Sequence, residues 1–457
     1  MLQENSFWKK CNWLTPFAIL FLCFITYRAA ESVRDSDIFF MVANGDYIVH
    51  HGFPKYNPFV IYDGFKIVIQ QWIPSVIAYW GYPRFEWAFL VAETLFGLSL
   101  LIFALYKLIS LEQPKQKSFL TASILVSLML YLYFGKPMLY SMILLVFQLY
   151  VCEKGASWLW IPFIVLLEAN IHASFIAFHF VYLLPYIVPG LTRYLKNTAK
   201  YKYIKSLPLM MVAALINPYG LSGALYLFNS YNDNLTDLTI SELDPMPLIS
   251  FSSFVCIFMV LFIGARLKLP VDSAKFYTFM GSCLLVILFP QIRNYIFLVV
   301  GSVPLLSIEL PSAKGKKVPP KSIMWGLAAC AVAATIIFFP TKSNYYMRPV
   351  KIADYLEGKE CVLFNEFSQG PYYEMRGIKV FTDSRPELYF KSINGKETVI
   401  GDFTDIISED NEKIERVRNK YNFTHYSTYK GTYLEKYLKK RGYKVVAKDG
   451  RSVLLTK

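Results

Sequence analysis

The stretch WLWIPFIVLLEANIHASFIAFHFVYLLPYIVP occupies residues 158–189 and is mostly apolar, with Glu168, Asn170 and His172 clustered near its middle. A membrane-spanning helix needs about 20 apolar residues, and fewer where neighbouring helices shelter it. This stretch is too long for one such helix, so we divide it at the polar cluster. It therefore predicts two consecutive membrane helices that run in opposite directions.

Similar apolar runs recur along most of the chain. They span residues 12–30, 86–107, 118–134, 138–151, 158–169, 171–190, 206–218, 250–265, 275–290, 294–310 and 322–340. Of the 457 residues, 55% are hydrophobic and 18% are charged, whereas soluble proteins carry about 25% charged residues. The sequence thus predicts an α-helical polytopic membrane protein with about 11 transmembrane helices. We expect the first run to be a retained anchor, because no signal-peptide cleavage site follows it.

Lys and Arg concentrate in alternate loops of this predicted bundle. The basic loops are 107–117, 193–205, 266–275 and 314–321. Cytoplasmic loops carry an excess of Lys and Arg, so we expect the N-terminus to be cytoplasmic. Loop 31–85 and the residues after about 344 are then extracytoplasmic. The net charge of +14 is explained by these loops, and we expect no nucleic-acid partner.

The composition changes at about residue 344, where charged residues become frequent. Residues 361–365 and 378–382 are rich in β-branched and aromatic side chains and predict strands. Residues 433–441 predict a helix that ends at Gly442, and Asp449-Gly450 predicts a tight hairpin turn. The sequence therefore predicts a transmembrane region over residues 1–343 and a small soluble α/β domain over residues 344–457.

The long external loop 31–85 begins with a pair of carboxylates, Asp35 and Asp37. A carboxylate at the membrane surface can deprotonate an acceptor hydroxyl as a leaving group departs. The pair could also hold Mg²⁺ or Mn²⁺ against a phosphate, or cap a following helix. The apolar segment 38–45 predicts a helix that lies along the membrane surface.

Polar side chains also collect at the predicted external ends of the membrane helices. Ionisable groups inside a membrane are costly and usually face a cavity or a partner, which makes Glu168, Asn170 and His172 candidates for substrate binding. Arg293 is a candidate for holding a phosphate. For His172 the alternative is a structural histidine that joins two helices. Asn217-Pro218 more often ends a helix than takes part in catalysis.

Asp383 and Arg385 directly follow the predicted strand 378–382. Binding residues are often found in loops at such positions. The alternative is that the two side chains pair with each other and fix the loop.

Several motifs resemble those of a large group of bacterial polytopic membrane proteins. They are Asp37-Ile-Phe-Phe-Met-Val-Ala-Asn-Gly45, His51-Gly-Phe-Pro54, Asn57-Pro-Phe59, Gln71-Trp72, Glu168-Ala-Asn170-Ile-His172, Asn217-Pro-Tyr-Gly220, Asn365-Glu-Phe-Ser-Gln-Gly370 and Phe381-Thr-Asp383-Ser-Arg385. The motifs and their order along the chain are similar to those of GT-C-type glycosyltransferases, which take a sugar from a polyprenyl-phosphate donor. The resemblance implies a GT-C-like fold over residues 1–343 and a location in a bacterial cell membrane.

The resemblance also implies roles for individual residues. Asp37 would be the catalytic carboxylate of the first loop, with Asp35 as the second candidate. Donor or acceptor contacts would come from the motif residues His51, Gln71, Trp72, Glu168, Asn170, His172, Asp383 and Arg385, together with Arg293, which is a candidate from its position at a helix start. Two positions depart from the pattern: Met41 occurs where we expect His, and Gln71 where we expect an acidic residue. These departures leave both a divalent cation and catalytic activity open.

We therefore expect a membrane glycosyltransferase that transfers a sugar from a polyprenyl-phosphate donor at the outer membrane face. The acceptor would be a cell-surface glycan or a lipid-linked molecule. One alternative is a non-catalytic scaffold or accessory subunit of a polysaccharide assembly system, which the departures at Met41 and Gln71 favour. A lipid-glycan transporter is less consistent with the sequence, because such proteins contain related halves and we find no internal repeat.

Overall fold

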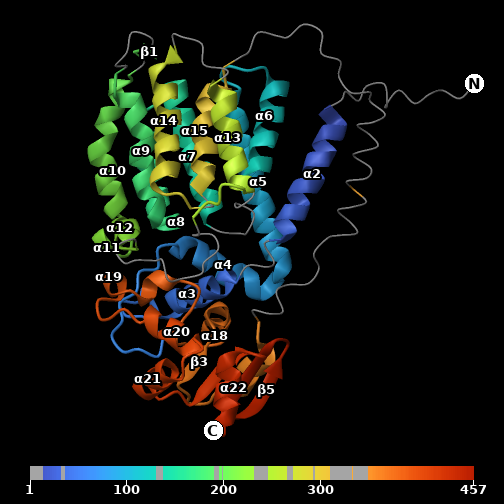
Figure 1. Ribbon diagram of the computed structural model, residues 1–457. Helices are drawn as coiled ribbons and strands as arrows, with labels where there is room; N and C mark the ends of the chain where they lie inside the picture. Colours follow the sequence, from blue (N-terminus) through green and yellow to red (C-terminus); the bar gives the residue numbers. More distant parts are fainter. Residues whose placement is uncertain are drawn as a thin grey trace, which may run out of the picture.

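The computed structural model describes residues 14–31, 36–129, 137–189, 195–197, 199–230, 245–264, 271–291, 294–308, 332 and 348–457. These residues form an upper bundle of upright helices and a lower part that contains the C-terminus (Figure 1). The lower part combines the segment between the first two bundle helices with the C-terminal residues. Two segments far apart in sequence therefore lie together below the bundle.

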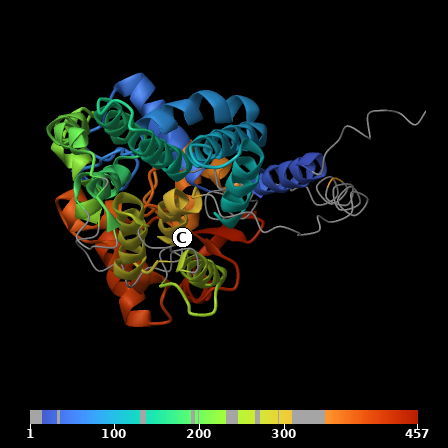
Figure 2. The same ribbon diagram turned by 90° about the horizontal axis from the view of Figure 1, so that it is seen from above.

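The bundle contains most of the apolar runs identified in the sequence. Its main helices are α2 (Leu14–Glu31), α5 (Trp87–Ile109), α6 (Lys115–Leu128), α7 (Met138–Lys154), α8 (Trp160–Ile171), α9 (Ile176–Ile187), α10 (Ser206–Leu215), α13 (Phe251–Gly264), α14 (Ser273–Leu288) and α15 (Tyr295–Leu306). The predicted run 322–340 lies outside the described residues except for residue 332, and every other predicted run overlaps a helix. Among the described helices, α5 alone is long and apolar enough to cross a membrane by itself, and several others are shorter and apolar. Viewed from above, α2 extends from one side of the bundle (Figure 2).

The predicted break in the run 158–189 is confirmed. Helix α8 ends at Ile171, His172 leaves the helical conformation with φ −158° and ψ 77°, and α9 begins at Ile176. At one end of the bundle, Tyr203 directly precedes α10. Its hydroxyl contacts the backbone oxygens of residues 151 and 156, which precede α8. At the other end, the Asn170 side chain donates to the backbone oxygen of residue 216, after α10. Helices α8 and α10 therefore run in the same direction, and α9 returns between them.

Loops with opposite predicted locations lie at opposite ends of the bundle. The short parallel pair β1 (Leu195–Lys196) and β2 (Val271–Asp272) joins two of the basic segments at the upper end (Figure 1). The small helices α11 (Leu221–Ala224) and α12 (Tyr226–Ser230) lie at the lower end, beside the C-terminal part. This arrangement agrees with the alternation of loops inferred from charge.

Helices α3 (Asp37–His51) and α4 (Trp72–Phe85) form an antiparallel pair below the bundle. Their pairing depends on Gly45, because a Cβ there would overlap the backbone oxygen of Ser75 and lie 2.7 Å from Tyr79 Cβ. Near the other end of α3, the ring of Phe39 meets that of Tyr82 edge-on at 5.9 Å. The apolar segment 38–45 is thus helical as predicted, but it packs inside the protein rather than along a membrane surface.

The C-terminal part is a small mixed sheet surrounded by short helices. The strands are β3 (Leu363–Asn365), β4 (His425–Tyr429), β5 (Lys444–Asp449) and β6 (Ser452–Thr456), in the order β3-β4-β6-β5. The helices are α17 (Val350–Leu356), α18 (Gly370–Met375), α19 (Lys391–Asn394), α20 (Ile400–Ile407), α21 (Asn411–Tyr421) and α22 (Tyr433–Lys440). Strand β3 is parallel to β4, and the other two pairings are antiparallel. The predicted helix at 433–441 and the hairpin about Asp449-Gly450 are confirmed.

The prediction of a sheet strand at residues 378–382 is wrong. The segment instead pairs with the first long loop: the Val380 amide donates to the Phe59 oxygen at 2.8 Å, and the Ile61 amide donates to the Val380 oxygen at 3.0 Å. Its extended shape was correctly predicted from its β-branched and aromatic residues. Its partner lies more than 300 residues away in the sequence, and local pattern does not specify such a partner.

One hydrophobic core joins the loop 31–85 to the C-terminal part. It contains Phe40 and Val60 from the loop and Phe364 and Phe381 from the C-terminal part, all 4% exposed or less. The predicted boundary near residue 344 lies outside the described residues. The described residues nevertheless show that the C-terminal part folds against the loop, and not as a detached unit.

We predict that Gly45→Ala lowers the thermal unfolding temperature of the detergent-purified protein. Its methyl group would have to displace Ser75 or Tyr79, at a cost of about 1–3 kcal/mol. Gly401→Ala is the matched control, since nothing lies within 4 Å of a Cβ there and alanine favours a helix. An equal or higher unfolding temperature for both variants would contradict the close pairing of α3 and α4.

Candidate functional site

Asp37 lies in the first turn of α3, at the contact between the bundle and the lower part. It is half-buried, and the Ser384 hydroxyl donates to its Oδ1 at 3.1 Å. Ser36 occupies the N-cap position, so Asp37 does not serve as the cap that the sequence left open. Asp35 lies outside the described residues. The first-loop carboxylate therefore faces the C-terminal segment that follows residue 380.

Arg385 links that segment to two carboxyl groups and to α3. Its guanidinium donates to Asp383 Oδ2 at 2.5 Å and to Glu374 Oε2 at 2.7 Å. The same group lies 4.4 Å from the centre of the Phe40 ring, and its Nη1 lies 3.4 Å from Asn44 Oδ1. Asp383 and Glu374 side chains are fully buried and Arg385 is 11% exposed. This cluster therefore contacts α3 through a polar atom of Asn44 and the ring of Phe40.

The two C-terminal motifs fix the backbone that carries this cluster. Asn365 donates through Nδ2 to the Thr382 oxygen at 2.7 Å and accepts from the Phe381 amide at 2.9 Å. Gly370 lies so close that a Cβ would overlap the Thr382 oxygen and lie 2.7 Å from Asp383 Cα. The motif 365–370 therefore serves as a support for the motif 381–385.

Burial dominates the electrostatics of the cluster. It raises the pKa of the Glu374 carboxyl well above its usual range, although Arg385 acts in the opposite direction. Burial alone would lower the pKa of the Arg385 guanidinium, but Asp383 and Glu374 raise it. Burial also raises the pKa of Glu387, which accepts a 2.9 Å hydrogen bond from the Tyr226 hydroxyl of α12. One charged guanidinium therefore bonds to two buried carboxyl groups, and burial favours the protonated form of Glu374.

Asp383 and Arg385 were predicted to bind substrate. Their charged groups bond to each other and to Glu374, and Asp383 is 0% exposed. This geometry supports the alternative interpretation from the sequence, in which the pair fixes the loop.

A second group of predicted residues joins α4 to α8. The Trp72 indole donates to Asn170 Oδ1 at 2.9 Å, and Asn170 Nδ2 also donates to the backbone oxygen of Ile216. Gln71 is buried at the start of α4, where its backbone oxygen accepts from the amide of residue 75. His51 is exposed at the end of α3, with its ring stacked on Tyr47 at 4.7 Å. The bond between Trp72 and Asn170 attaches the lower part to the bundle.

The third group is a buried network within the bundle. His179 Nε2 lies 3.0 Å from Glu168 Oε2, and its Nδ1 lies 2.8 Å from Gln148 Oε1. The Gln148 amide nitrogen donates to the backbone oxygen of His179, which fixes the amide oxygen toward the ring. Both ring nitrogens therefore have hydrogen-bond partners. The two side chains are almost completely buried, with exposures of 1% and 0%.

Ser141 extends this network to His172. Its hydroxyl lies 2.5 Å from Glu168 Oε1 and 3.0 Å from His172 Nδ1. A serine hydroxyl has one proton, and the shorter contact with the carboxylate takes it. His172 therefore donates from Nδ1 and joins the end of α8 to α7, as in the structural alternative. Asn217 lies just after the end of α10, and its Nδ2 donates to the backbone oxygen of Ala214 in the last turn of that helix. This contact agrees with the predicted role of Asn217 in ending the helix.

The predicted residues thus form separate groups. Helices α3 and α4 are closest where Gly45 meets Ser75. Asp37 lies eight residues from this point along α3. Trp72 lies three residues from it along α4, in the opposite direction. At 1.5 Å per residue, the two ends of the α3–α4 pair are roughly 16 Å apart. His172 belongs to the end marked by Trp72 and Asn170, so it does not share a reaction centre with Asp37.

Arg293, the predicted phosphate ligand, lies outside the described residues. Another cation, Arg348, lies beside the first turns of α3. Its guanidinium is 5.9 Å from the ring centres of both Phe39 and Tyr372, and 3.8 Å from Glu86 Oε1. Arg348 follows the predicted end of the transmembrane region, and no sequence motif distinguishes it.

The described residues do not assemble a metal-ligand set. No group of three or more His, Cys, Asp or Glu side chains among them has the geometry to hold an ion. Met41, which replaces the expected His, is 4% exposed within the shared hydrophobic core. We therefore assign no step to a metal ion.

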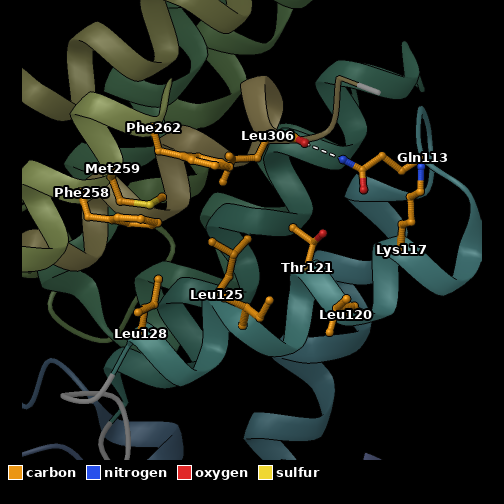
Figure 3. A pocket seen from close by; sticks show the side chains of 11 residues that line it. Gln113, Lys117, Leu120, Thr121, Leu125, Leu128, Phe258, Met259, Phe262 and Leu306 are labelled. Carbon is orange, nitrogen blue, oxygen red and sulfur yellow. Dashed lines mark hydrogen bonds between the residues drawn. The ribbon is translucent and has the colours of Figure 1, made fainter. Parts of the chain in front are cut away.

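A cavity of about 410 Å³ lies between α6 and α13, near the upper end of the bundle. Figure 3 shows Gln113 and Lys117 at one end and the rings of Phe258 and Phe262 on the opposite wall. Its lining is largely apolar and includes none of the predicted site residues. The cavity is therefore distinct from the Asp37 site.

Several residues with buried or functional-site contacts were not identified from the sequence. His179 and Glu93 each interrupt an apolar helix, and Glu93 accepts a 2.9 Å hydrogen bond from Tyr140. A lone ionisable residue in an apolar run is a signal that could have identified both. Ser384 and Glu374 have no such signal, because their roles depend on contacts with distant segments.

Comparison with known proteins supports the fold. The structure is similar to the oligosaccharyltransferase of Archaeoglobus fulgidus in the apo form, with a TM-score of 0.52 and 14% identity over 93% of this chain and 70% of that chain. The same enzyme tethered to an acceptor peptide containing the NVT sequon gives a TM-score of 0.49 with the same identity and coverage. No protein-family model and no curated protein matches the sequence. The archaeal enzyme is a GT-C-type glycosyltransferase, so the apo structure supports the GT-C-like fold expected from the motifs.

We predict that Arg385→Ala lowers the free energy of unfolding by about 3–5 kcal/mol, because it leaves two buried carboxyl groups without their cation. Urea denaturation of the detergent-purified protein, followed by circular dichroism, measures the loss. Lys413→Ala is the control: its side chain is 53% exposed and pairs with Asp405, which is 24% exposed, and such surface pairs contribute about 0–1 kcal/mol. Equal losses in the two variants would contradict the role given to Arg385.

Proposed function

We propose that this protein is a membrane glycosyltransferase that transfers a sugar from a polyprenyl-phosphate donor at the outer membrane face. The observation that carries the proposal is the position of Asp37. It is a half-buried carboxylate in the first turn of α3, at the junction of the bundle and the C-terminal part. The motif resemblance and the fold likeness support the same class of reaction.

The proposed reaction is a single inverting displacement. Asp37 takes the proton of the acceptor hydroxyl as the acceptor oxygen bonds to the anomeric carbon of the sugar. The bond between that carbon and the donor phosphate oxygen breaks, and its electron pair leaves with the polyprenyl phosphate. Stabilisation of the departing phosphate is a large part of the rate in such reactions.

Arg348 is our proposed cation for that phosphate. It lies beside Phe39, two residues after Asp37, and an Arg fork suits phosphate oxygens. Arg293, the phosphate ligand expected from the sequence, lies outside the described residues, and His172 belongs to the opposite end of the α3–α4 pair. The acceptor would be a cell-surface glycan or a lipid-linked molecule.

The proposed orientation is multi-pass, with a cytoplasmic N-terminus and an extracytoplasmic C-terminal part. The excess of Lys and Arg in alternate loops supports it. The apolar helices shorter than a full span would be sheltered by their neighbours in the bundle.

A non-catalytic scaffold is the second candidate function. It is favoured by the burial of Met41 in the hydrophobic core and by the mutual pairing of Asp383 and Arg385. A scaffold has no need of an ionised Asp37, so substitution of that residue separates the two proposals.

We predict that Asp37→Asn lowers the turnover of a labelled short-chain polyprenyl-phosphate hexose by at least about 100-fold, because the amide cannot accept the proton. Release of the hexose to water measures the reaction without a known acceptor. Asp63→Asn, in an exposed position of the same loop, should retain activity. In the same assay, Arg348→Gln should raise the KM for the donor.

Equal turnover by the Asp37→Asn variant and the wild type would eliminate Asp37 as the base. Absence of turnover in the wild type, across glucose, mannose and galactose donors, would instead favour the scaffold. Unfolding temperatures of all variants serve as the check on folding.

For the orientation, we predict that an impermeant maleimide labels Glu409→Cys in intact cells and labels Ser157→Cys only after lysis. Both positions are exposed, one in the C-terminal part and the other before α8 at the opposite end of the bundle. The variants are made in a background whose native cysteines are replaced by serine. Labelling of Ser157→Cys in intact cells, with protection of Glu409→Cys, would reverse the proposed orientation.

A further inference from the structure

We propose that the outer end of the C-terminal part binds an anionic glycan chain. The inference rests on the proposed function in one respect: it narrows the acceptor to glycans that carry phosphate or carboxylate groups. The binding itself rests on the charges of helix α22 and strand β5. The residues that carry it form what we call the basic surface: Lys436 and Lys440 of α22, and Lys444 and Lys448 of β5.

Positive charge is concentrated at the end of the chain. Residues 430–457 contain nine Lys and Arg residues but only two acidic residues, Glu435 and Asp449. Both carboxyl groups already have partners: the Lys439 ammonium donates to Glu435 Oε1 at 2.6 Å, and the Lys351 amide donates to Asp449 Oδ2 at 2.9 Å. The excess of positive charge is therefore not neutralised within this segment.

The lysines of the basic surface are exposed and have no acidic partner. All of them are solvent-exposed, and among the described residues none of them forms an ion pair or a side-chain hydrogen bond. Helix α21 differs, because its Arg416 guanidinium lies 2.7 Å from Asp402 Oδ1 and 2.5 Å from Asp405 Oδ2. The charges of α21 are thus paired within the protein, whereas those of the basic surface are available to an external anion.

The fold brings these lysines into one region. Lys436 and Lys440 are about one turn apart on α22, which is roughly 6 Å along the helix axis. Helix α22 ends at Lys440 and β5 begins at Lys444, so the last turn of the helix lies near the start of the strand. At the other end, burial raises the pKa of Glu435, but the hydrogen bonds it accepts and the nearby charge of Lys448 lower it overall. Lys448 therefore lies near the first turn of α22.

The position of the basic surface favours a soluble polymer over the bilayer as its partner. Figure 1 shows α22 and β5 at the lower end of the molecule, beside the C-terminus and away from the helical bundle. Phospholipids around the bundle would be remote from these lysines, and in the proposed orientation the surface faces the cell exterior. A chain with repeated negative charges fits several lysines at once, because each contact releases counterions and contacts on one chain reinforce each other.

Such binding would serve the proposed reaction without a contact at Asp37. A glycan chain held at the outer end of the C-terminal part has a higher effective concentration at the rest of the same molecule. Its terminal hydroxyl would therefore reach the reaction centre more often than that of a neutral chain of equal length. The proposed acceptor is accordingly an anionic glycan.

The test is equilibrium binding of fluorescently labelled polymers to the full chain in a non-ionic detergent, followed by fluorescence anisotropy. Poly(glycerol phosphate) and polygalacturonate are the anionic probes, and dextran is the neutral probe. A variant without the basic surface should bind both anionic probes at least about 10-fold more weakly at low salt, with a smaller salt dependence. It carries Lys436→Gln, Lys440→Gln, Lys444→Gln and Lys448→Gln. The matched control removes the same charge from exposed positions elsewhere in the C-terminal part, through Lys379→Gln, Lys391→Gln, Lys396→Gln and Lys413→Gln.

Loss of anionic-polymer binding in the first variant alone, with equal unfolding temperatures in all three proteins, supports the proposal. Equal affinity of the wild type for dextran and for the anionic polymers would overturn it. Equal weakening in the two variants would also overturn it, because only the net charge of the chain would then matter. The assay needs neither donor nor turnover. Intact polymer binding without any hexose turnover would therefore leave the binding surface supported and refute only the proposed function.

Discussion

The Arg385 guanidinium, enclosed between the carboxyl groups of Asp383 and Glu374, is the interaction on which the lower part depends. Removing a charge from water is expensive unless a partner of opposite charge comes with it. Here the three groups are buried together where the segment 383–385 lies against α3. The same guanidinium rests on Phe40 and reaches Asn44. A single buried cation thus couples the C-terminal part to the first long loop.

Because this contact fixes α3, it also fixes the place of Asp37. The α3–α4 pair crosses beneath the bundle, with the Trp72–Asn170 bond at one end and Asp37 at the other. The bundle provides a rigid frame, and the buried contact between His179 and Glu168 joins helices within it. The proposed reaction centre is therefore separate from this network, and substitutions in the two should affect different properties.

Much of the helical fold was predictable, because long apolar runs and the break at Glu168–His172 are local signals. The hairpin about Asp449-Gly450 was predictable for the same reason. The candidate site was predicted less well. Asp37 was identified as a loop carboxylate, but its bond to Ser384 joins residues 347 positions apart, and local pattern specifies no such contact. The prediction of a sheet strand at 378–382 was wrong for a similar reason. The extended shape of the segment was predictable from its residues, but its pairing with the loop near Val60 was not. The pairing of Asp383 with Arg385 was foreseen only as an alternative, because a sequence does not reveal burial.

The most direct test of the account is a cryo-electron microscopy structure of the full chain bound to a polyprenyl-phosphate hexose. The account predicts the anomeric carbon of the sugar beside the Asp37 carboxylate, at a distance that lets an acceptor hydroxyl reach that carboxylate. It also predicts the phosphate near Arg348 and an intact bond from Ser384 to Oδ1. A donor bound only in the cavity between α6 and α13, with the α3 end empty, would contradict it.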